Sequence, residues 1–599
     1  MKPHRPLISQ DSFDSWLLVL TTLAPAIVAA VGVIGAPDAA HDDGVVRTVG
    51  AGFTGLFHAL DLLLAAPFLL LPFGTRALRA GLASAVVAGA AGALAFTTAR
   101  SVTQAVVPVA LKKLGIARGM DRAGMRLASA VSAASVLAAL VGPVFQTEAS
   151  APGGAVVGAC LVLAALHLAL LGETVLLAFV LGLAVTEGPF VLLAAIVASV
   201  AFPRGRRDRT RTTQATIAFT LGLLPLVVGA LLAHRAPELS DPAASLLTPA
   251  TRPVALGSGV LFAFATTTIG RPVLVLSGVG AALSFLADRR LVGAIIGLVV
   301  TAGIAMQLKQ PAGPDAFAAP VLVGVLAVHV FAGVAFGVLV LAIARARVPF
   351  AEWSAALVVV LELVLPLGAL DQTSTERAAR VPSASSIWND IAWGSAPPAS
   401  VVLVADRATM RRIATTRAVG ELRADLVFVP QYDVLGRAGQ NALLEEPKLA
   451  PLYRDIVLGL PPEELSLAEL GAQRAVLATF DPTWERALSR HLVPLGLSGR
   501  FEAEPRGTSD RKKALDGLAS AKARLVTITK KDPALAAATS VLLRARAVGM
   551  AATGERDMLS QSLDDLRAFA PDDPTGAMLV RRLVTTKGAI DVHDLGGPS

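Results

Sequence analysis

The feature that most constrains this chain is a succession of long apolar runs that fills its first 371 residues. Of the 599 residues, 54% are hydrophobic and only 16% are charged, and the charged residues are sparse before Asp371 and dense after it. An apolar run of about 20 residues has the length of a helix that crosses a bilayer. We therefore expect a polytopic α-helical membrane domain over 1–371 and a water-soluble half over 372–599.

The apolar pattern predicts about 11 membrane spans. They lie near 16–36, 80–99, 125–143, 153–171, 173–186, 188–202, 213–234, 271–287, 291–307, 317–345 and 353–371. Several are rich in alanine, glycine and valine, which permits close helix packing. The two short runs on either side of Glu187-Gly188-Pro189 are alternatively one bent helix. Two further stretches, 59–73 and 253–269, contain Pro, Gly or Thr, and we expect them at the interface or as re-entrant segments.

The basic residues predict the orientation. With a cytoplasmic N-terminus, 17 Lys and Arg fall in inner loops against 7 in outer loops, which is the bias that cytoplasmic loops show. The first apolar run has spanning length, so it is interpreted as an uncleaved helix and not as a signal peptide. An odd number of spans then places the first loop and the soluble half outside the cytoplasm. A span count wrong by one would reverse the side of the soluble half.

The net charge of +8 does not indicate a nucleic-acid partner. Residues 1–371 hold 24 Lys and Arg against 18 Asp and Glu, whereas the remainder holds 29 against 27. The basic excess therefore lies mainly in the loops between spans, and no basic stripe with interleaved aromatic residues is present. The single cysteine, Cys160, lies in an apolar run, which excludes a disulfide within the chain.

The soluble half is expected to contain an α/β domain over 372–510. It opens with a linker rich in Ser, Thr and Arg. Three apolar runs of strand length follow: Val401–Ala405, Leu426–Val429 and Ala475–Phe480. A helical stretch around 410–419 lies after the first run, and another begins at Pro482 after the third. No motif for a nucleotide, a dinucleotide or a hydrolytic zinc is present. We interpret this domain as a module that binds an acceptor or a protein partner.

A helical tail is expected over 511–599. Gly554 lies between two helical stretches, and Pro571-Asp572-Asp573-Pro574 follows the second. This arrangement is typical of one tetratricopeptide-like hairpin, and it equally fits a plain helical cap.

An acidic, turn-rich segment, Ala36-Pro37-Asp38-Ala39-Ala40-His41-Asp42-Asp43-Gly44, follows the first apolar run. An acceptor hydroxyl does not ionise at neutral pH, so a base that activates it must lie within hydrogen-bond reach of its proton. A carboxylate in a loop fixed between two spans meets this requirement. The alternative is a solvated acidic turn, because the composition also favours a turn.

Several segments together resemble the bacterial protein O-mannosyltransferase-like membrane proteins, an uncharacterised-domain family with the GT-C glycosyltransferase architecture. The similar segments are Asp42-Asp43-Gly44, His58, 71–76, 79–85, 145–149, Ser240-Asp241-Pro242, Asp288-Arg289-Arg290 and the strand that begins at Val401. The resemblance implies a GT-C-like protein of a bacterial inner membrane. Its reaction would be the transfer of a sugar from a polyprenyl-phosphate donor to a protein or glycan acceptor at the outer face.

The resemblance also implies roles for individual residues. Asp42 or Asp43 would be the catalytic base, and the residues that bind donor or acceptor would be His58, Arg76, Arg79, Glu148 and Asp241. Arginines suit a lipid phosphate because they bind its oxygens through paired N–H groups. No metal site is predicted, although Glu148 is compatible with a divalent metal. The expected partners are membrane lipid, a lipid-linked sugar, an acceptor and a protein bound by the C-terminal domain.

Two other functions stay open. The Pro-Pro-Gly that the family carries after the histidine is replaced by Ala59-Leu60-Asp61, and Ser150 replaces the second acid of an outer loop, so the chain is alternatively a catalytically degenerate scaffold. Glu362 and His329 lie within apolar runs, where a charge costs about 2.5–3.5 kcal/mol. They suggest a proton-coupled secondary transporter. Alternatively, they are neutral groups that form hydrogen bonds with neighbouring helices, and the same alternative applies to His167 and Glu187.

Overall fold

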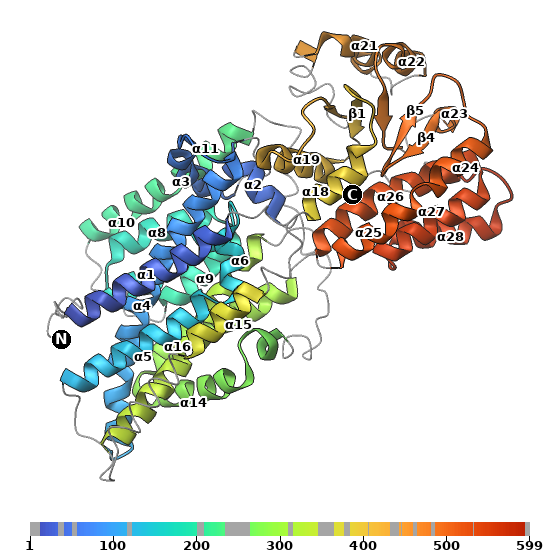
Figure 1. The fold of residues 1–599 in the computed structure, drawn as a ribbon. Coiled ribbons are helices and arrows are strands. Elements are labelled where there is room, and N and C mark those ends of the chain that lie inside the picture. The colour runs from blue at the N-terminus through green and yellow to red at the C-terminus, as the bar shows by residue number, and fades with distance from the viewer. Residues whose placement is uncertain are drawn as a thin grey trace.

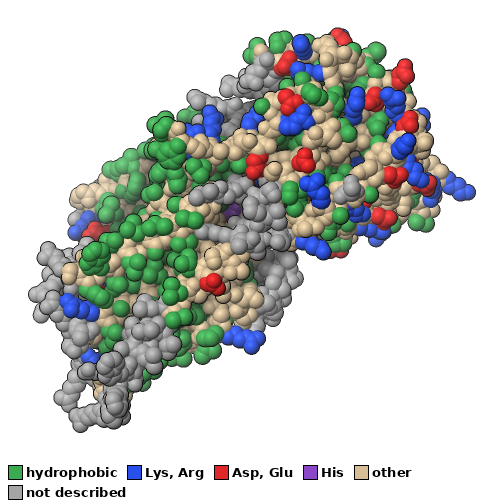
Figure 2. Space-filling view, viewed as in Figure 1, with side chains coloured by type: hydrophobic (Ala, Val, Ile, Leu, Met, Phe, Trp, Pro, Cys, Tyr) green, Lys and Arg blue, Asp and Glu red, His purple; other side chains and the backbone are tan. Residues whose placement is uncertain are grey.

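A computed structural model gives the structure of the chain over fifteen described ranges. They are 12–33, 41–50, 57–116, 122–200, 209–233, 264–308, 315–345, 364–375, 384–404, 406–431, 443–444, 446–458, 464–480, 486–530 and 532–592. The described residues form an elongated bundle of helices and a separate C-terminal part in which helices surround a small sheet (Figure 1). Hydrophobic side chains cover the visible face of the bundle, whereas charged side chains gather over the C-terminal part (Figure 2).

The bundle is built from helices of very different lengths. They are α1 (Ser12–Gly32), α2 (Asp42–Thr48), α3 (Ala59–Leu69), α4 (Arg76–Lys113), α5 (Arg122–Leu140), α6 (Pro143–Ser150), α7 (Val156–Leu171), α8 (Thr174–Thr186), α9 (Pro189–Val200), α10 (Arg209–Gly222), α11 (Leu224–Ala233), α14 (Arg271–Ala287), α15 (Arg289–Leu308) and α16 (Asp315–Ala344). Residues 364–375 add a further helical segment. The long helices α4 and α16 contact most of the others and form the centre of the bundle.

Small residues bring the bundle helices close together, as their composition predicts. A Cβ atom added to Gly89 of α4 would lie 3.0 Å from the carbonyl oxygen of Thr22 in α1, and one on Gly92 would collide with Thr21. Gly280 of α14 meets the backbone of Phe331 in α16 in the same way. Side chains larger than glycine at these positions would force the helices apart.

Six helices among the described residues are long and apolar enough to cross a membrane, or seven if the bent pair α5–α6 is one span. One of the six is α26 (Pro533–Thr553), which packs between the sheet and other helices of the C-terminal part. An apolar helix enclosed by protein is a core helix, so five lie in the bundle. These bundle helices leave large apolar side chains open to a lipid phase, among them Trp16, Ile27, Val31, Ile217 and Val300.

The expected span boundaries need correction at several places. The run 80–99 belongs to the 38-residue α4, which continues past Arg100 to Lys113. The runs 173–186 and 188–202 form two separate helices, α8 and α9, of 13 and 12 residues. At about 1.5 Å per residue, neither reaches the roughly 30 Å of a hydrocarbon core. The total of eleven spans stays a prediction, and 253–263 and 353–363 lie outside the described residues.

The C-terminal part contains a five-stranded sheet with the order β2-β1-β3-β5-β4. Its strands are β1 (Val401–Val404), β2 (Val427–Pro430), β3 (Val476–Ala478), β4 (Leu492–Leu495) and β5 (Ser498–Phe501). Strands β2, β1 and β3 are parallel, whereas β4 and β5 form an antiparallel hairpin on the β3 edge. The three predicted strands coincide with β1, β2 and β3. The hairpin was not predicted, because its strands are short and contain exposed polar residues such as Arg500.

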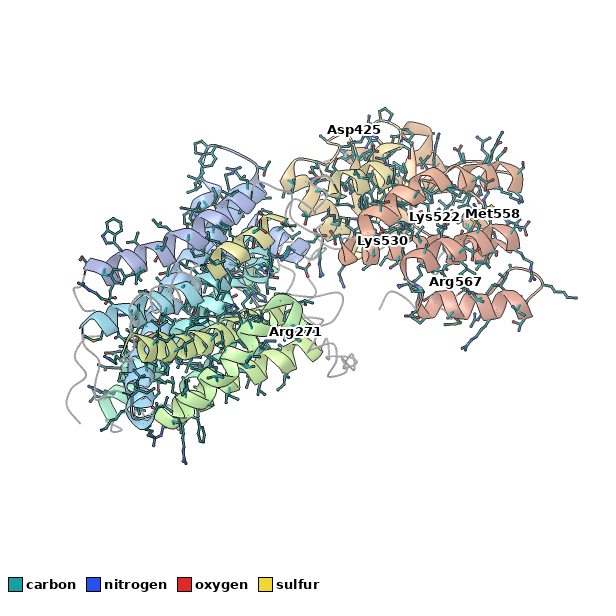
Figure 3. All side chains as sticks on the ribbon, turned by 60° about the horizontal axis from the view of Figure 1, so that its bottom comes forward. Arg271, Asp425, Lys522, Lys530, Met558 and Arg567 are labelled. Carbon is teal, nitrogen blue, oxygen red and sulfur yellow. The ribbon has the colours of Figure 1, made fainter. Side chains whose placement is uncertain are left out.

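Helices cover the sheet and form the tail. They are α18 (Ala384–Asn389), the π-helix η2 (Asp390–Gly394), α19 (Arg407–Val419), the 3-10 helix η3 (Pro447–Leu449), α21 (Ala450–Val457), α22 (Glu464–Gln473), α23 (Arg486–Ser489), α24 (Thr508–Asp516), α25 (Ala519–Thr529), α26, α27 (Arg556–Phe569) and α28 (Pro574–Thr585). The helix expected from Pro482 is described only as α23. In Figure 3, the labelled side chains of this part are Asp425, Lys522, Lys530, Met558 and Arg567, and Arg271 is a labelled residue of the bundle.

The tail forms the hairpin that Gly554 predicts. Helices α26 and α27 pack against each other, and Gly554 joins them with a positive φ of 77°, a conformation that favours glycine. Helix α28 follows after Asp573, which caps it by accepting a hydrogen bond from Gly576. One hairpin does not establish a repeat, and the tetratricopeptide assignment stays a prediction.

The short helix α2 joins the two parts of the molecule. Its Val46 is buried in a cluster of the C-terminal part that includes Trp388 and Met410. Val45 and Val49 pack in a second cluster, against the start of α4 and the end of α19. Side chains of α2 are therefore buried by both parts of the chain, and α19 lies beside it (Figure 1).

Candidate functional site

The segment that carries the predicted catalytic acids is helical. Asp42 and Asp43 occupy the first turn of α2, where the helix dipole favours negative charge. A Cβ atom on Gly44 would lie 2.6 Å from the carbonyl oxygen of Pro152 and 2.9 Å from that of Gly153. Only glycine lets α2 approach this turn so closely, and the contact fixes the position of both acids.

Asp42 is paired with an arginine from the C-terminal part. Nη1 of Arg412 in α19 lies 2.8 Å from Oδ1 of Asp42, and the Arg412 side chain is 1% exposed. The hydroxyl of Thr415, one helical turn along α19, donates to the backbone carbonyl of Asp42 over 3.3 Å. The carboxylate is therefore held by one guanidinium at Oδ1.

Asp43 makes a looser pair with the neighbouring arginine. Nη1 of Arg411 lies 3.3 Å from Oδ1 of Asp43, and the two side chains are 20% and 32% exposed. The two acids of α2 thus face two consecutive arginines of α19, and the pairs join the membrane bundle to the C-terminal part.

Burial raises the pKa of Asp42 to about 6, and the like charge of Asp43 acts in the same direction. The charge and hydrogen bond of Arg412 oppose this shift, as does the hydroxyl of Thr415. A carboxylate with a pKa near neutrality is a stronger base than an exposed one and is still ionised at pH 7.

Glu148 lies beside α2, in a helix and not in the expected loop. It belongs to α6, and its Oε1 lies 3.5 Å from Nε2 of His41, the residue that precedes α2. Its Oε2 accepts a hydrogen bond from the backbone N–H of Ala155 over 3.0 Å. Glu148 therefore connects the turn at 152–155, which Gly44 contacts, to the start of α2.

A second polar group lies on the other side of α2. Nδ1 of His58 is 3.1 Å from Oε2 of Glu187, and the backbone N–H of His58 donates to the carbonyl of Thr186 over 2.7 Å. Arg47 of α2 donates to Oδ2 of Asp61 over 3.1 Å and to the carbonyl of Gly153 over 3.3 Å. Among the described residues, His58, Asp61 and Glu187 form a group of metal-ligating side chains.

The remaining predicted binding residues do not converge on the acids in the described structure. Arg79 donates to the carbonyl oxygens of Leu69 and Leu71, each over 2.7 Å, and so caps the end of α3. Arg76, at the start of α4, is exposed. Asp241 lies outside the described residues. Donor binding by these three residues stays a prediction.

The residues that suggested a transporter are placed as follows. His329 is buried in α16, and its Nδ1 lies 2.9 Å from the carbonyl of Val325 in the same helix. Glu187 ends α8 and bonds to His58, so it is not a mid-span charge. His167 is half-buried in α7, and Glu362 lies outside the described residues.

Four residues of this region were not predicted from the sequence: Arg47, Asp61, Arg411 and Arg412. Asp61 could have been predicted from the sequence, because an isolated acid in an apolar run is energetically costly unless it has a partner. Arg411 and Arg412 could not have been predicted, because they lie about 370 residues from the acids that they pair with. In the sequence they resemble ordinary residues of a surface helix.

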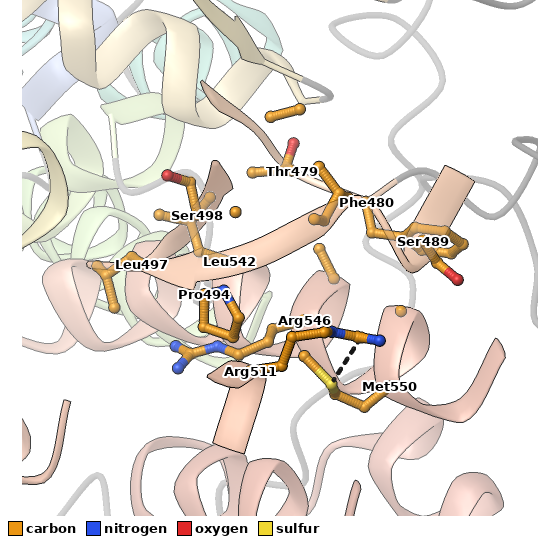
Figure 4. Close-up of a pocket in the computed structure, with 15 residues that line it drawn as sticks. Thr479, Phe480, Ser489, Pro494, Leu497, Ser498, Arg511, Leu542, Arg546 and Met550 are labelled. Atoms are coloured by element: carbon orange, nitrogen blue, oxygen red, sulfur yellow. Dashed lines mark hydrogen bonds between the residues drawn. The ribbon is translucent and has the colours of Figure 1, made fainter. Parts of the chain in front are cut away.

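Cavities also lie elsewhere in the described structure. One, about 30 Å³, lies between the β4–β5 hairpin and α26 and is lined by Arg511, Arg546, three hydroxyl side chains and apolar residues. Arg511 reaches toward Met550 there, and Arg546 extends to the opposite side (Figure 4). A smaller one, about 10 Å³, is lined by apolar side chains of α5, α6, α7 and α16. Asp42 and Asp43 line neither cavity.

The fold and the site define a multi-pass helical membrane protein whose C-terminal α/β and helical part is joined to the bundle by paired acids and arginines. Neither a family model nor a curated protein matches this chain. The chain is similar to the crystal structure of ArnT from Cupriavidus metallidurans in the apo state, with 16% identity and a TM-score of 0.44 over 82% of this chain and 99% of that one. The same protein bound to undecaprenyl phosphate gives 16% identity and a TM-score of 0.47, over 81% and 97%.

Proposed function

We propose that the chain is a membrane glycosyltransferase of the GT-C type, with Asp42 as its catalytic base. The observation that carries the proposal is the position of Asp42. It lies at the junction of the membrane bundle and the C-terminal part, its side chain is only 15% exposed, and its pKa is raised to about 6. Perturbed carboxylates of this kind are concentrated at functional sites.

The chemistry follows from the two oxygens of this carboxylate. Arg412 engages Oδ1, so Oδ2 is the atom that would take the proton of an acceptor hydroxyl. The acceptor oxygen then attacks the anomeric carbon of the sugar, and the bond from that carbon to the lipid phosphate breaks. The products are the glycosylated acceptor and polyprenyl phosphate, and Arg412 keeps Asp42 oriented throughout.

The charge distribution supports an outer location for this site. Lys113, at the far end of α4, donates to the carbonyl of Leu286 at the end of α14, and Arg289 lies over the ring of Phe285 at the same end. The start of α4 lies at the opposite end, beside α2 and α19. By the positive-inside rule, the end with Lys112, Lys113, Arg289 and Arg290 is cytoplasmic.

The C-terminal part would bind the acceptor or a protein partner. Its helix α19 supplies the arginines that face Asp42 and Asp43. An acceptor held by this part would therefore lie next to the membrane surface at which a lipid-linked donor is presented.

The two ion pairs favour one alternative, a scaffold without catalytic activity. In that function Asp42 and Asp43 would only dock α19 onto α2, and the raised pKa would be a consequence of burial. The two functions differ in their need for a carboxylate, because docking tolerates any side chain that satisfies Arg412.

The test is a transfer assay with the full chain in native membranes that contain polyprenyl-phosphate sugars, read as labelled glycan in the membrane and secreted fractions. We expect Asp42→Asn and the double variant with Asp43→Asn to lose transfer at least 100-fold while the folded protein is retained. A general base contributes about 10²–10⁴-fold to rate. Asp425→Asn, an exposed acid of the C-terminal part, is the control. Undiminished transfer by the double variant would overturn the assignment.

A further inference from the structure

We propose that His58, Asp61 and Glu187 bind a divalent transition-metal ion of the Zn²⁺ type, at a site distinct from the paired acids of α2. One ligand atom from each of the three side chains lies within 4.8 Å of the others. The residues come from two places in the chain: His58 precedes α3, Asp61 lies in its first turn, and Glu187 follows α8. The proposal does not depend on the transferase function.

The burial of these three side chains indicates that a metal ion occupies the space between them. Asp61 and Glu187 are 4% and 1% exposed, and His58 is nearly covered. Within the described part of the chain, Oδ1 of Asp61 and Oε1 of Glu187 are buried without a hydrogen-bond partner. A buried oxygen without a partner costs about 1–3 kcal/mol, and more if it is charged. Two such oxygens in one group indicate a ligand that satisfies both.

The surrounding charges favour a cation. Oδ2 of Asp61 is already engaged by Arg47, which leaves Oδ1 available. If both carboxylates are ionised, the single positive charge of Arg47 leaves the group with a net negative charge, which a divalent ion reverses. Arg47 then acts from the second shell, where it orients the carboxylate of Asp61.

The backbone at His58 supports a dedicated site. His58 has a positive φ of 68°, an uncommon conformation for a residue other than glycine, and its N–H bonds to the carbonyl of Thr186. This bond connects the segment with His58 and Asp61 to the end of α8, directly before Glu187. The three side chains are thus held together by the backbone and not only by their own contacts.

The ligand set identifies the class of ion. One imidazole and two carboxylates suit Zn²⁺ or Mn²⁺ better than Mg²⁺ or Ca²⁺, which take oxygen ligands alone. Ligands that bind zinc at about 2.0–2.2 Å lie roughly 3–4 Å from one another. The observed spread of up to 4.8 Å therefore requires a small inward movement of the side chains. Three protein ligands leave one position for water or another oxygen.

The experiment measures metal bound to the full chain purified in detergent, stripped with a chelator, loaded with Zn²⁺ and freed of excess ion. We expect one Zn²⁺ per chain in the parent protein. His58→Gln and Glu187→Gln should each weaken binding at least ten-fold, and Arg47→Gln roughly 10–100-fold, as second-shell changes do. Glu148→Gln, at a neighbouring carboxylate that is 13% exposed and lies outside the group, is the matched control and should bind as the parent does.

A second measurement does not depend on how the variants fold. Co²⁺ loaded into the unaltered chain should give the visible absorption bands of a low-symmetry site with a nitrogen ligand, and added Zn²⁺ should remove them. No bound Zn²⁺ and no Co²⁺ bands in the parent chain would overturn the proposal. Equal binding by the parent and Glu187→Gln would also overturn it, because the metal would then be held elsewhere.

Discussion

Asp42 shows how one side chain serves two parts of the fold at once. It begins a short helix whose side chains are buried by both parts of the chain, and its partner Arg412 comes from a helix 370 residues further on. The acid is therefore more constrained than the turn-rich composition of its segment suggests. Its position is set by two contacts: that of Gly44 with the turn at Pro152 and Gly153, and that of α2 with α19.

The raised pKa of Asp42 predicts the acid side of the pH profile. With a pKa of about 6, the carboxyl becomes protonated below that pH and cannot accept the acceptor proton. We expect kcat/KM for transfer to fall about tenfold per pH unit below pH 6. In Asp43→Asn, removal of the neighbouring negative charge should lower the Asp42 pKa, so the fall should begin at a lower pH. A profile that is flat from pH 7 to pH 5 would contradict this role.

Gly44 predicts a stability effect at a single position. Its replacement by alanine places a methyl group 2.6 Å from the carbonyl oxygen of Pro152, a backbone atom that cannot rotate away. We expect Gly44→Ala to lower the free energy of unfolding by about 1–3 kcal/mol, as overpacking does, and to reduce transfer with it. Gly293→Ala, where no atom lies within 4 Å of the new methyl group, is the control for denaturant unfolding. Equal stability of the two variants would show that α2 can move freely.

At the scale of elements, the pair α2 and α19 is the least predictable feature of the molecule. The apolar pattern placed the bundle helices near their observed positions and three strands in their observed places, because burial imposes a period that a sequence displays. It missed the length of α4, the helix α6 and the β4–β5 hairpin. These depend on local geometry at a bent or exposed segment, such as the 63° bend between α5 and α6, and not on apolar periodicity.

The two ion pairs between α2 and α19 should differ in strength. Arg412→Met leaves the carboxylate of Asp42, which is only 15% exposed, without its cation, so we expect a loss of up to about 3–5 kcal/mol of stability. Arg411→Met breaks a pair whose members are 20% and 32% exposed, and solvent screening limits that loss to about 0–1 kcal/mol. Thermal unfolding of the two variants in detergent compares them directly. Equal losses would mean that the lower exposure of the Asp42–Arg412 pair does not strengthen the docking of α19 onto α2.

The candidate site was predicted in part, and the reason is physical. The sequence identified Asp42, Asp43, His58 and Glu148 as polar residues at the boundary of apolar runs, and all four lie around α2. It did not predict their partners, because a salt bridge between distant segments leaves no local pattern. Asp61 was interpreted as a departure from a family motif, whereas the structure places it in a buried polar group with Arg47.

At the scale of the whole molecule, the basic residues predict which side each end occupies. In a chain whose Cys160 is replaced by serine, we expect a membrane-impermeant maleimide to label Glu504→Cys in intact cells but not Lys112→Cys. Both positions are exposed, Glu504 in the C-terminal part and Lys112 at the far end of α4. Both should be labelled after permeabilisation. Labelling of Lys112→Cys alone in intact cells would place the C-terminal part in the cytoplasm and remove the proposed outer-face reaction.

The most direct measurement is transfer by a chain in which the α2–α19 pair is reversed, with Asp42→Arg and Arg412→Asp combined. The reversed pair can still dock α19 onto α2, so we expect thermal stability to recover relative to Asp42→Arg alone. The proposed base, Asp42, is then absent, so transfer should stay at least 100-fold below that of the parent chain, the loss expected when a general base is removed. Recovery of transfer together with stability would contradict the account, because Asp42 would then serve only to hold the two parts together.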